Sequence, residues 1–145
     1  MAAKTVEETM VDWAREGVIE GFKLFSIRLD STEESVETLE KIAGALHRMI
    51  TEGYQTAGMP ERPSKEEIWL WSTRLGAYLG KLITRFVGGK WIAKPHAEIG
   101  FGYAIPLANV NFFPIVKMND RMTKGDSENL VEYYIRLKEL VATDS

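Results

Sequence analysis

The residues best suited to catalysis or metal binding are two histidines and several closely spaced carboxylates. His96 precedes Glu98 by two positions, and on a strand this spacing places both side chains on one face. The pair could supply two metal ligands or an acid–base couple. Two ligands are too few for a metal site, and no cluster of Asp, Glu or His elsewhere completes the set. We therefore predict no metal and no cofactor, and we interpret His47 as a residue at the edge of a helical core.

Two further carboxylate pairs are each four residues apart, Asp12 with Glu16 and Glu33 with Glu37. This spacing places the members of a pair on one face of a helix, which is usually a solvated face. A hydrolase would need one such carboxylate in an apolar cleft that raises its pKa, and nothing in the sequence indicates that cleft. A carboxylate-dependent hydrolase, with the carboxylates near His96, is therefore only an alternative.

Basic side chains accumulate in the second half of the chain. Residues 1–67 contain 8 Lys and Arg against 14 Asp and Glu, whereas residues 68–145 contain 10 against 7. Either the two halves attract each other within the fold, or a basic face binds an acidic partner, an anion or a nucleic acid. The pI near 5.5 argues against nucleic acid, because affinity grows with the number of phosphates neutralised. The candidate binding residues are Arg85, Lys90, Trp91, Lys94, His96, Lys117, Arg121 and Lys124.

Small residues recur in two segments, at Gly76 and Gly80 and again at Gly100 and Gly102. Glycines at such spacing let another backbone or ring approach closely, so we interpret them as packing positions. The alternative is that they line a groove for a ligand. Neither segment matches a phosphate-binding loop, because these glycines lie inside expected elements rather than between a strand and a helix.

The elements that would position these residues begin with helices. Three capping boxes, in which Ser or Thr is followed three residues later by Glu, mark helix starts. The boxes are Thr5 with Glu8, Ser31 with Glu34, and Ser64 with Glu67. Apolar residues follow at helical spacing, so we expect helices from residue 5 to as far as 27, over 31–53, and from 64 to the glycines at 88 and 89. The third has the longest apolar stripe and should be the central, buried helix.

The hydrophobic period changes after the third helix. Residues 91–92, 99–107 and 110–113 read as strands of a small antiparallel sheet, with turns near Pro95 and at 108–109. A short helix over 115–123, with Pro114 as its first residue, and a final helix from Asp126 or Ser127 should follow. We thus predict an α+β fold that is mostly helical, with about four to five helices packed on about three strands, roughly residues 90–113.

The composition is typical of one globular domain, here residues 1–145. Apolar residues make up 45% and charged residues 27%, which argues against disorder. The absence of cysteine excludes a disulfide scaffold, a thiolate zinc site and a cysteine nucleophile. The first residues lack the apolar segment of a signal peptide, and no stretch reaches the ~20 apolar residues of a membrane span. We expect a cytoplasmic protein without membrane contact.

Four segments together resemble an uncharacterised bacterial family of domains of unknown function. They are LGAYLGKL at 75–82, GGKW at 88–91, FFPIVKMNDR at 112–121, and Asp12-Trp13 followed by LDSTEESV at 29–36. The resemblance implies a helical first half, a glycine-lined helix and a following strand that begins with Trp. Lys81 stands where that family usually has an acidic residue, so no acidic role carries over. Members are often suspected of being toxin-immunity partners, and no established reaction is implied.

These observations favour a non-enzymatic protein-binding module. Four tryptophans support this expectation because Trp and Arg are enriched at binding hot spots. The resemblance implies a more specific function, that of an immunity-type protein that binds and blocks a toxin. The alternatives are an anion or nucleic-acid binder that uses the basic residues between Lys90 and Lys124, and the hydrolase described above. The sequence leaves open the identity of the partner and whether the chain forms a homo-oligomer.

Overall fold

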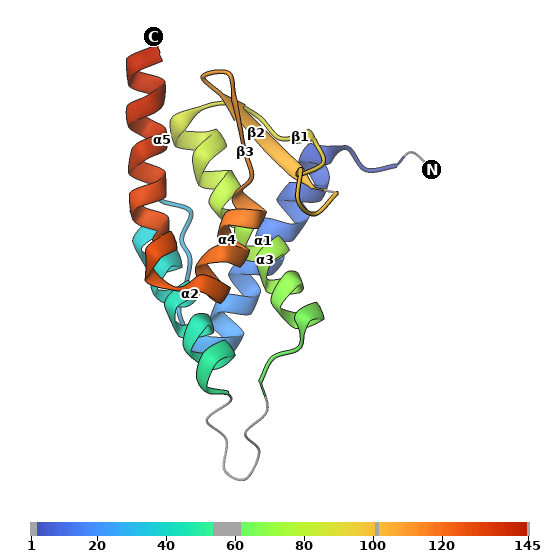
Figure 1. Ribbon diagram of the computed structural model, residues 1–145, viewed down its shortest axis with the longest axis vertical. Helices are drawn as coiled ribbons and strands as arrows, with labels where there is room; N and C mark the ends of the chain where they lie inside the picture. Colours follow the sequence, from blue (N-terminus) through green and yellow to red (C-terminus); the bar gives the residue numbers. More distant parts are fainter. Residues whose placement is uncertain (1–2, 54–61, 101, 145) are drawn as a thin grey trace.

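The computed structural model describes residues 3–53, 62–100 and 102–144, which form five α-helices and a three-stranded antiparallel sheet (Figure 1). This confirms the predicted α+β class. The α-helices are α1 (Val6–Phe25), α2 (Ser35–Glu52), α3 (Lys65–Leu82), α4 (Pro114–Lys124) and α5 (Leu130–Asp144). The strands are β1 (Ile92–Ala93), β2 (Tyr103–Leu107) and β3 (Val110–Phe112). Two short turns of helix are a π-helical turn (Ile83–Val87) after α3 and a 3₁₀ turn (Asp126–Glu128) after α4.

Helix α3 is the central element, as its apolar stripe predicts. It packs against α1 on one side and α4 on the other, while α2 contacts α4 and α5 (Figure 1). Leu75, Tyr78, Leu79 and Leu82 of α3 are completely buried. Burial of each of these large side chains contributes about 1.5–3 kcal/mol of hydrophobic stabilisation.

Two glycines on α3 allow this close packing. A Cβ atom at Gly80 would lie 1.8 Å from Cζ2 of Trp91, and one at Gly76 would lie 2.5 Å from the Cα atom of Ile115. The indole ring and the start of α4 therefore rest directly on the α3 backbone. The packing interpretation holds at both positions, and no space is left there for a ligand.

The predicted start of α2 is wrong, whereas the capping boxes of α1 and α3 are both present. Helix α2 begins at Ser35, one turn later than expected, and Glu34 precedes it without a side-chain cap. Ser31 has a left-handed φ of 64°. Its N–H donates to the Tyr78 hydroxyl at 2.9 Å, and its Oγ accepts from Lys81 Nζ at 2.9 Å. These bonds to α3 replace the local cap, which sequence spacing alone could not reveal.

The end of the chain differs in a similar way. The sequence predicts a final helix from Asp126 or Ser127, but α5 starts at Leu130. The side chain of Asn129 accepts from the Glu132 N–H at 3.0 Å and so caps the new start.

The sheet has the predicted three strands, but β2 is shorter than the alternating pattern suggested. Gly100 and Gly102 have φ angles of 77° and 145°, which end the extended conformation before Tyr103. Phe101 lies outside the described residues. Ala108 and Asn109, both with positive φ, form the predicted turn between β2 and β3, and such two-residue turns match the twist of a hairpin.

We expect Gly80→Ala to lower the free energy of unfolding by about 2 kcal/mol, because the new methyl group would overlap the Trp91 ring. Helix propensity alone predicts the opposite sign, a gain of about 1 kcal/mol. Urea unfolding followed by circular dichroism measures the change. In a Trp91→Leu background the same substitution should cost less, and a stabilised single variant would contradict the packing described.

Candidate functional site

Arg121, one of the predicted binding residues, is a structural residue in the core. Its side chain is only 4% exposed, and its guanidinium donates to both oxygens of Glu40 at 2.7–3.0 Å. It also donates to Asp126 at 3.1 Å. Glu40 in turn accepts from the N–H of Leu130 at 3.0 Å. The pair therefore joins α2, α4 and the start of α5, and Arg121 is not available to a partner.

Lys117 and Lys124 are also neutralised by neighbouring carboxylates. Lys117 donates to Glu128 and lies over the Tyr133 ring, and this hydrogen bond holds the pKa of the Glu128 carboxyl below its usual value. Lys124 pairs with Asp120 at 3.3 Å, one turn earlier on α4. The basic end of α4 is thus largely compensated.

The other predicted binding residues lie near the π-helical turn and the sheet. Trp91 belongs to the hydrophobic core, whereas Arg85, Lys90 and Lys94 are exposed and make no ion pair with any described residue. The guanidinium of Arg85 lies 5.4 Å above the Phe86 ring. The eight predicted residues therefore do not form one continuous basic face.

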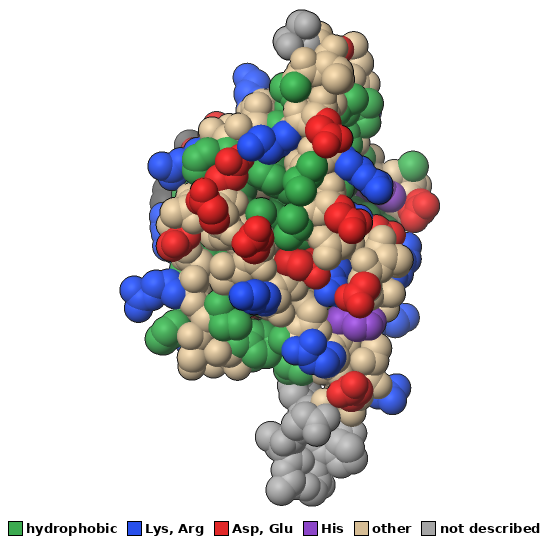
Figure 2. Space-filling view, turned by 90° about the vertical axis from the view of Figure 1, so that its left-hand side faces the viewer, with side chains coloured by type: hydrophobic (Ala, Val, Ile, Leu, Met, Phe, Trp, Pro, Cys, Tyr) green, Lys and Arg blue, Asp and Glu red, His purple; other side chains and the backbone are tan. Residues whose placement is uncertain are grey.

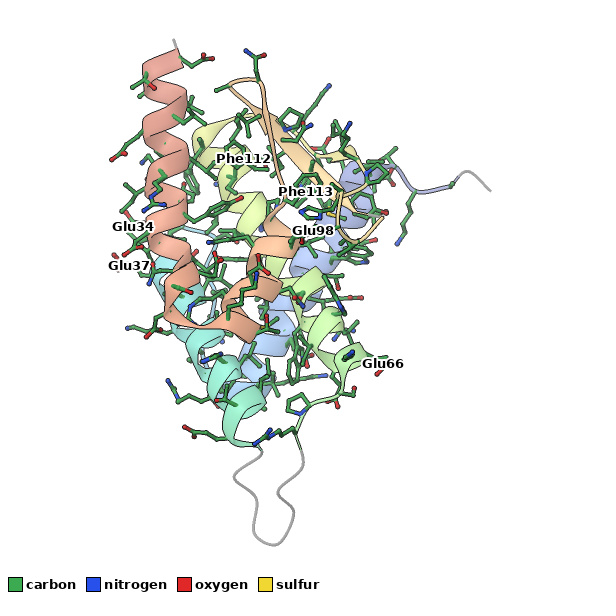
Figure 3. The ribbon with its side chains drawn as sticks, in the orientation of Figure 1. Glu34, Glu37, Glu66, Glu98, Phe112 and Phe113 are labelled. Carbon is green, nitrogen blue, oxygen red and sulfur yellow. The ribbon has the colours of Figure 1, made fainter. Side chains whose placement is uncertain are left out.

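His96 and Glu98 form a local turn rather than a site. The Glu98 N–H donates to His96 Nδ1 at 3.2 Å, and the imidazole packs edge-on against Phe113 at 4.7 Å between ring centres. Glu98 itself is exposed on the loop after β1 (Figure 3). Across the described ranges, no three Asp, Glu or His side chains come close enough to hold a metal ion.

The carboxylate pairs on the helices have structural partners as well. The pKa of Asp12 is lowered because Lys4 binds its carboxylate, and the pKa of Glu33 is lowered because Lys138 and Tyr134 donate to it. A general acid needs the opposite shift. Glu37, with Glu34 beside it, points away from the molecule (Figure 3).

Four ion pairs, made by three basic residues, connect the acidic first half of the chain with the basic second half. Arg74 pairs with Glu16 and Glu20 at 3.2 Å, Arg121 pairs with Glu40, and Lys138 pairs with Glu33 at 2.9 Å. On the face formed by α2 and α5, cations and carboxylates are interspersed (Figure 2). Acidic residues of the first half therefore neutralise several basic residues of the second half within the fold.

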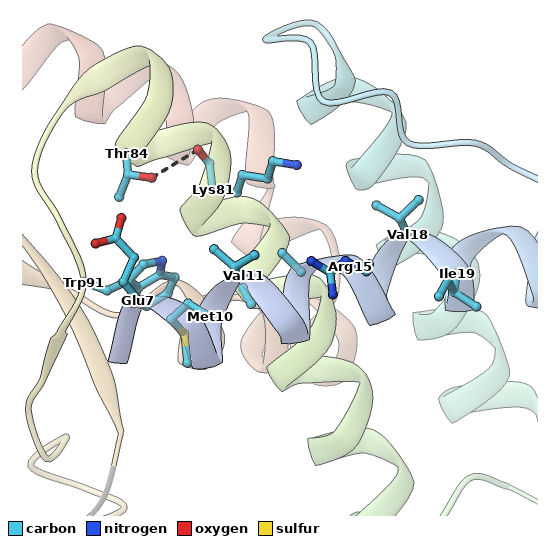
Figure 4. A pocket seen from close by; sticks show the side chains of 11 residues that line it. Glu7, Met10, Val11, Arg15, Val18, Ile19, Lys81, Thr84 and Trp91 are labelled. Atoms are coloured by element: carbon cyan, nitrogen blue, oxygen red, sulfur yellow. Dashed lines mark hydrogen bonds between the residues drawn. The ribbon is translucent and has the colours of Figure 1, made fainter. Parts of the chain in front are cut away.

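A groove that the sequence did not predict lies between α1 and α3 (Figure 4). It has a volume of about 300 Å³. Trp91 closes one end, and the side chain of Lys81 extends from α3 along the groove, away from Trp91 (Figure 4). The lining residues are mainly apolar: Glu7, Met10, Val11, Ala14, Arg15, Val18, Ile19, Ala77, Lys81, Thr84 and Trp91.

The groove continues along α1 into a second, shallower pocket. Val18 and Ile19 line both, and the second adds Phe22, Lys23, Arg28 and Leu29. Val11, Ile19 and Phe22 are 52%, 47% and 50% exposed, although they are large and apolar. We name Val11, Val18, Ile19 and Phe22 the α1 apolar face. Its signal in the sequence was a second stripe at i, i+7 and i+11, beside the stripe that packs on α3.

Cations surround the α1 apolar face. Lys81 Nζ has only the neutral hydroxyl of Ser31 as a hydrogen-bond partner among the described residues. Arg15 reaches Asp12 at 3.4 Å, and Arg28 lies 5.7 Å above the Phe22 ring. Lys23 has no ion pair with a described residue. The groove therefore combines an apolar floor with a positively charged rim.

Comparisons of the chain with models of protein families, with curated proteins and with solved structures found no match. None of the helices formed by the described residues combines the length and apolar composition that crossing a membrane requires.

We expect Glu40→Gln to lower the free energy of unfolding by about 3 kcal/mol, because it leaves the buried Arg121 without its main counter-charge. Denaturant unfolding at neutral pH measures the effect. Glu37→Gln, an exposed carboxylate on the same helix, is the control and should change stability by less than about 0.5 kcal/mol. Equal effects of the two substitutions would show that the pair does not hold the helices together.

Proposed function

We propose that this protein is a non-enzymatic protein-binding module and that the groove between α1 and α3 is its contact surface. The observation that carries the proposal is the α1 apolar face, where Val11, Ile19 and Phe22 are about half exposed on one side of one helix. Contiguous apolar patches with a polar rim are typical of interaction sites in soluble proteins. Phe22 and the neighbouring Arg28 also belong to residue types that serve as binding anchors.

The polar groups of the groove support binding rather than catalysis. They are Glu7, Arg15, Lys81 and Thr84, and none is arranged as a nucleophile beside its base. The Thr84 hydroxyl donates to the backbone carbonyl of Lys81 at 3.2 Å, so its proton is directed away from a substrate (Figure 4).

The sequence resemblance suggests that the partner is a toxin, which makes an immunity function the specific form of this proposal. The groove provides a surface on which such a partner could be held. The alternative, an anion or nucleic-acid binder, has less support, because Lys117, Arg121 and Lys124 already pair with carboxylates.

The proposal predicts that a partner can be cross-linked from the α1 apolar face. A photo-reactive p-benzoylphenylalanine at position 19 should capture a discrete protein in cells of the source organism. The same group at Ile135 is the control, because that side chain is equally exposed, at 48%, but lies on α5. Ile19→Ser with Phe22→Ser should weaken binding of the captured protein at least 10-fold.

Folding of each variant is checked by its circular dichroism and melting temperature. Adducts that form equally at both positions, or at position 135 alone, would contradict the proposal. So would a captured protein whose affinity is unchanged by the double substitution.

A further inference from the structure

We infer that the groove along α1 receives an amphipathic helix of the partner whose flanks are acidic. This inference rests on the proposed protein-binding function and names the class of partner. It follows from three properties of the groove: its length, its apolar floor and the sign of the charges around it.

The length of the groove fits a helix. Its lining extends on α1 from Glu7 to Lys23, which at 1.5 Å per residue is about 24 Å, or between four and five turns. The two pockets share Val18 and Ile19, so the floor is continuous. An apolar groove beside a straight helix is the surface on which amphipathic helices dock, with anchors spaced at i, i+3 or i+4, and i+7.

The charges around the groove select an acidic partner. Four cations line it, Arg15, Lys23, Arg28 and Lys81, against the single carboxylate of Glu7. This is the reverse of the net charge of −3 for the whole chain. Complementary charges of this kind determine which partner binds and how fast it associates.

The other carboxylates of α1 do not cancel this positive rim. Asp12 binds Lys4 as well as Arg15, while Glu16 and Glu20 pair with Arg74 of α3. Glu20 also accepts from the Trp71 indole N–H at 3.2 Å. Glu16 and Glu20 are thus held by α3, and only Arg15 of the groove cations shares a carboxylate, that of Asp12. Lys23, Arg28 and Lys81 have no ion pair with a described residue.

Lys81 is the anchor of the predicted contact. It is partly buried at the groove wall, and its ammonium has a neutral hydroxyl as its hydrogen-bond partner. Arg15 lines the same groove from α1 (Figure 4). A carboxylate placed between Lys81 and Arg15 would be held by two charge-assisted hydrogen bonds in a site that the partner helix shields from water.

A second copy of the chain fits this groove poorly. A two-fold dimer through the same surface would set the patch against itself, so four cations would face four cations and Arg15 would approach its own equivalent. Nucleic acid fits poorly too, because the cations lie around an apolar floor rather than in a row along a phosphate backbone. A small amphiphile with one carboxylate is the remaining competitor, and the experiment includes it.

The test uses three fluorescein-labelled, hydrocarbon-stapled helical peptides of 18 residues. The first has Leu at i, i+4, i+7 and i+11 with Glu on both flanks, the second has the same Leu positions with Lys flanks, and the third has the composition of the first with Leu scrambled around the helix. Fluorescence anisotropy gives the affinities at 50 and 300 mM salt. We expect the first peptide to bind at least 10-fold more tightly than either other one, and to weaken with salt.

Charge reversal locates the contact. Lys81→Glu should weaken the acidic peptide about 10-fold and strengthen the Lys-flanked peptide. Lys124→Glu, an exposed cation on α4 that lies outside the groove, is the matched control and should leave both affinities within twofold. Circular dichroism confirms that each variant is folded.

Each remaining outcome overturns the inference. Equal affinity for the acidic and basic peptides would show that the groove does not select its partner by charge. Equal affinity for the first and the scrambled peptide would show that it does not recognise an amphipathic helix. Binding of dodecanoate without binding of any peptide assigns the groove to a small amphiphile. If cross-linking at position 19 captures a protein while the peptides fail in one of these ways, only this inference is lost and the protein-binding function stands.

Discussion

The contact between Trp91 and Gly80 is the constraint on which the rest of the arrangement depends. The indole ring occupies the space that a side chain on α3 would take, so the start of the sheet is held directly against the central helix. The same ring closes one end of the groove beside α1. A single close approach therefore fixes the position of the sheet and shapes the surface that we propose for binding.

Electrostatics organises the remainder of the fold. The acidic first half and the basic second half meet in pairs that bridge α1 with α3, α2 with α4, and the turn before α2 with α5. The candidate cations on α4, Lys117, Arg121 and Lys124, all pair with carboxylates of the same chain. Lys23, Arg28 and Lys81 around the α1 groove, and Arg85, Lys90 and Lys94 near the sheet, have no ion pair with a described residue. The distribution of unpaired charge therefore differs from the distribution of charge along the sequence.

Parts of the fold were predictable because their causes are local. The capping boxes at Thr5 and Ser64, the hairpin turn at Ala108 and the proline start of α4 each depend on residues within a few positions. The start of α2 was not predictable, because Ser31 exchanges its local cap for bonds to α3 residues about fifty positions away. The start of β2 was moved by glycine conformations that alternation of side chains does not encode.

The sequence by itself determined the mixed helical and sheet class, the buried role of α3 and the lack of cysteine chemistry, since these follow from period, composition and close neighbours. Only the tertiary structure decided which charges are free and where an apolar surface stays open. Val11, Ile19 and Phe22 look like core residues in the sequence, and they become a surface because α3 covers the other stripe of α1. Arg121 looks like a surface cation and becomes core because Glu40, from a distant helix, neutralises it. Burial and pairing depend on partners far away in the chain, and no local pattern carries that information.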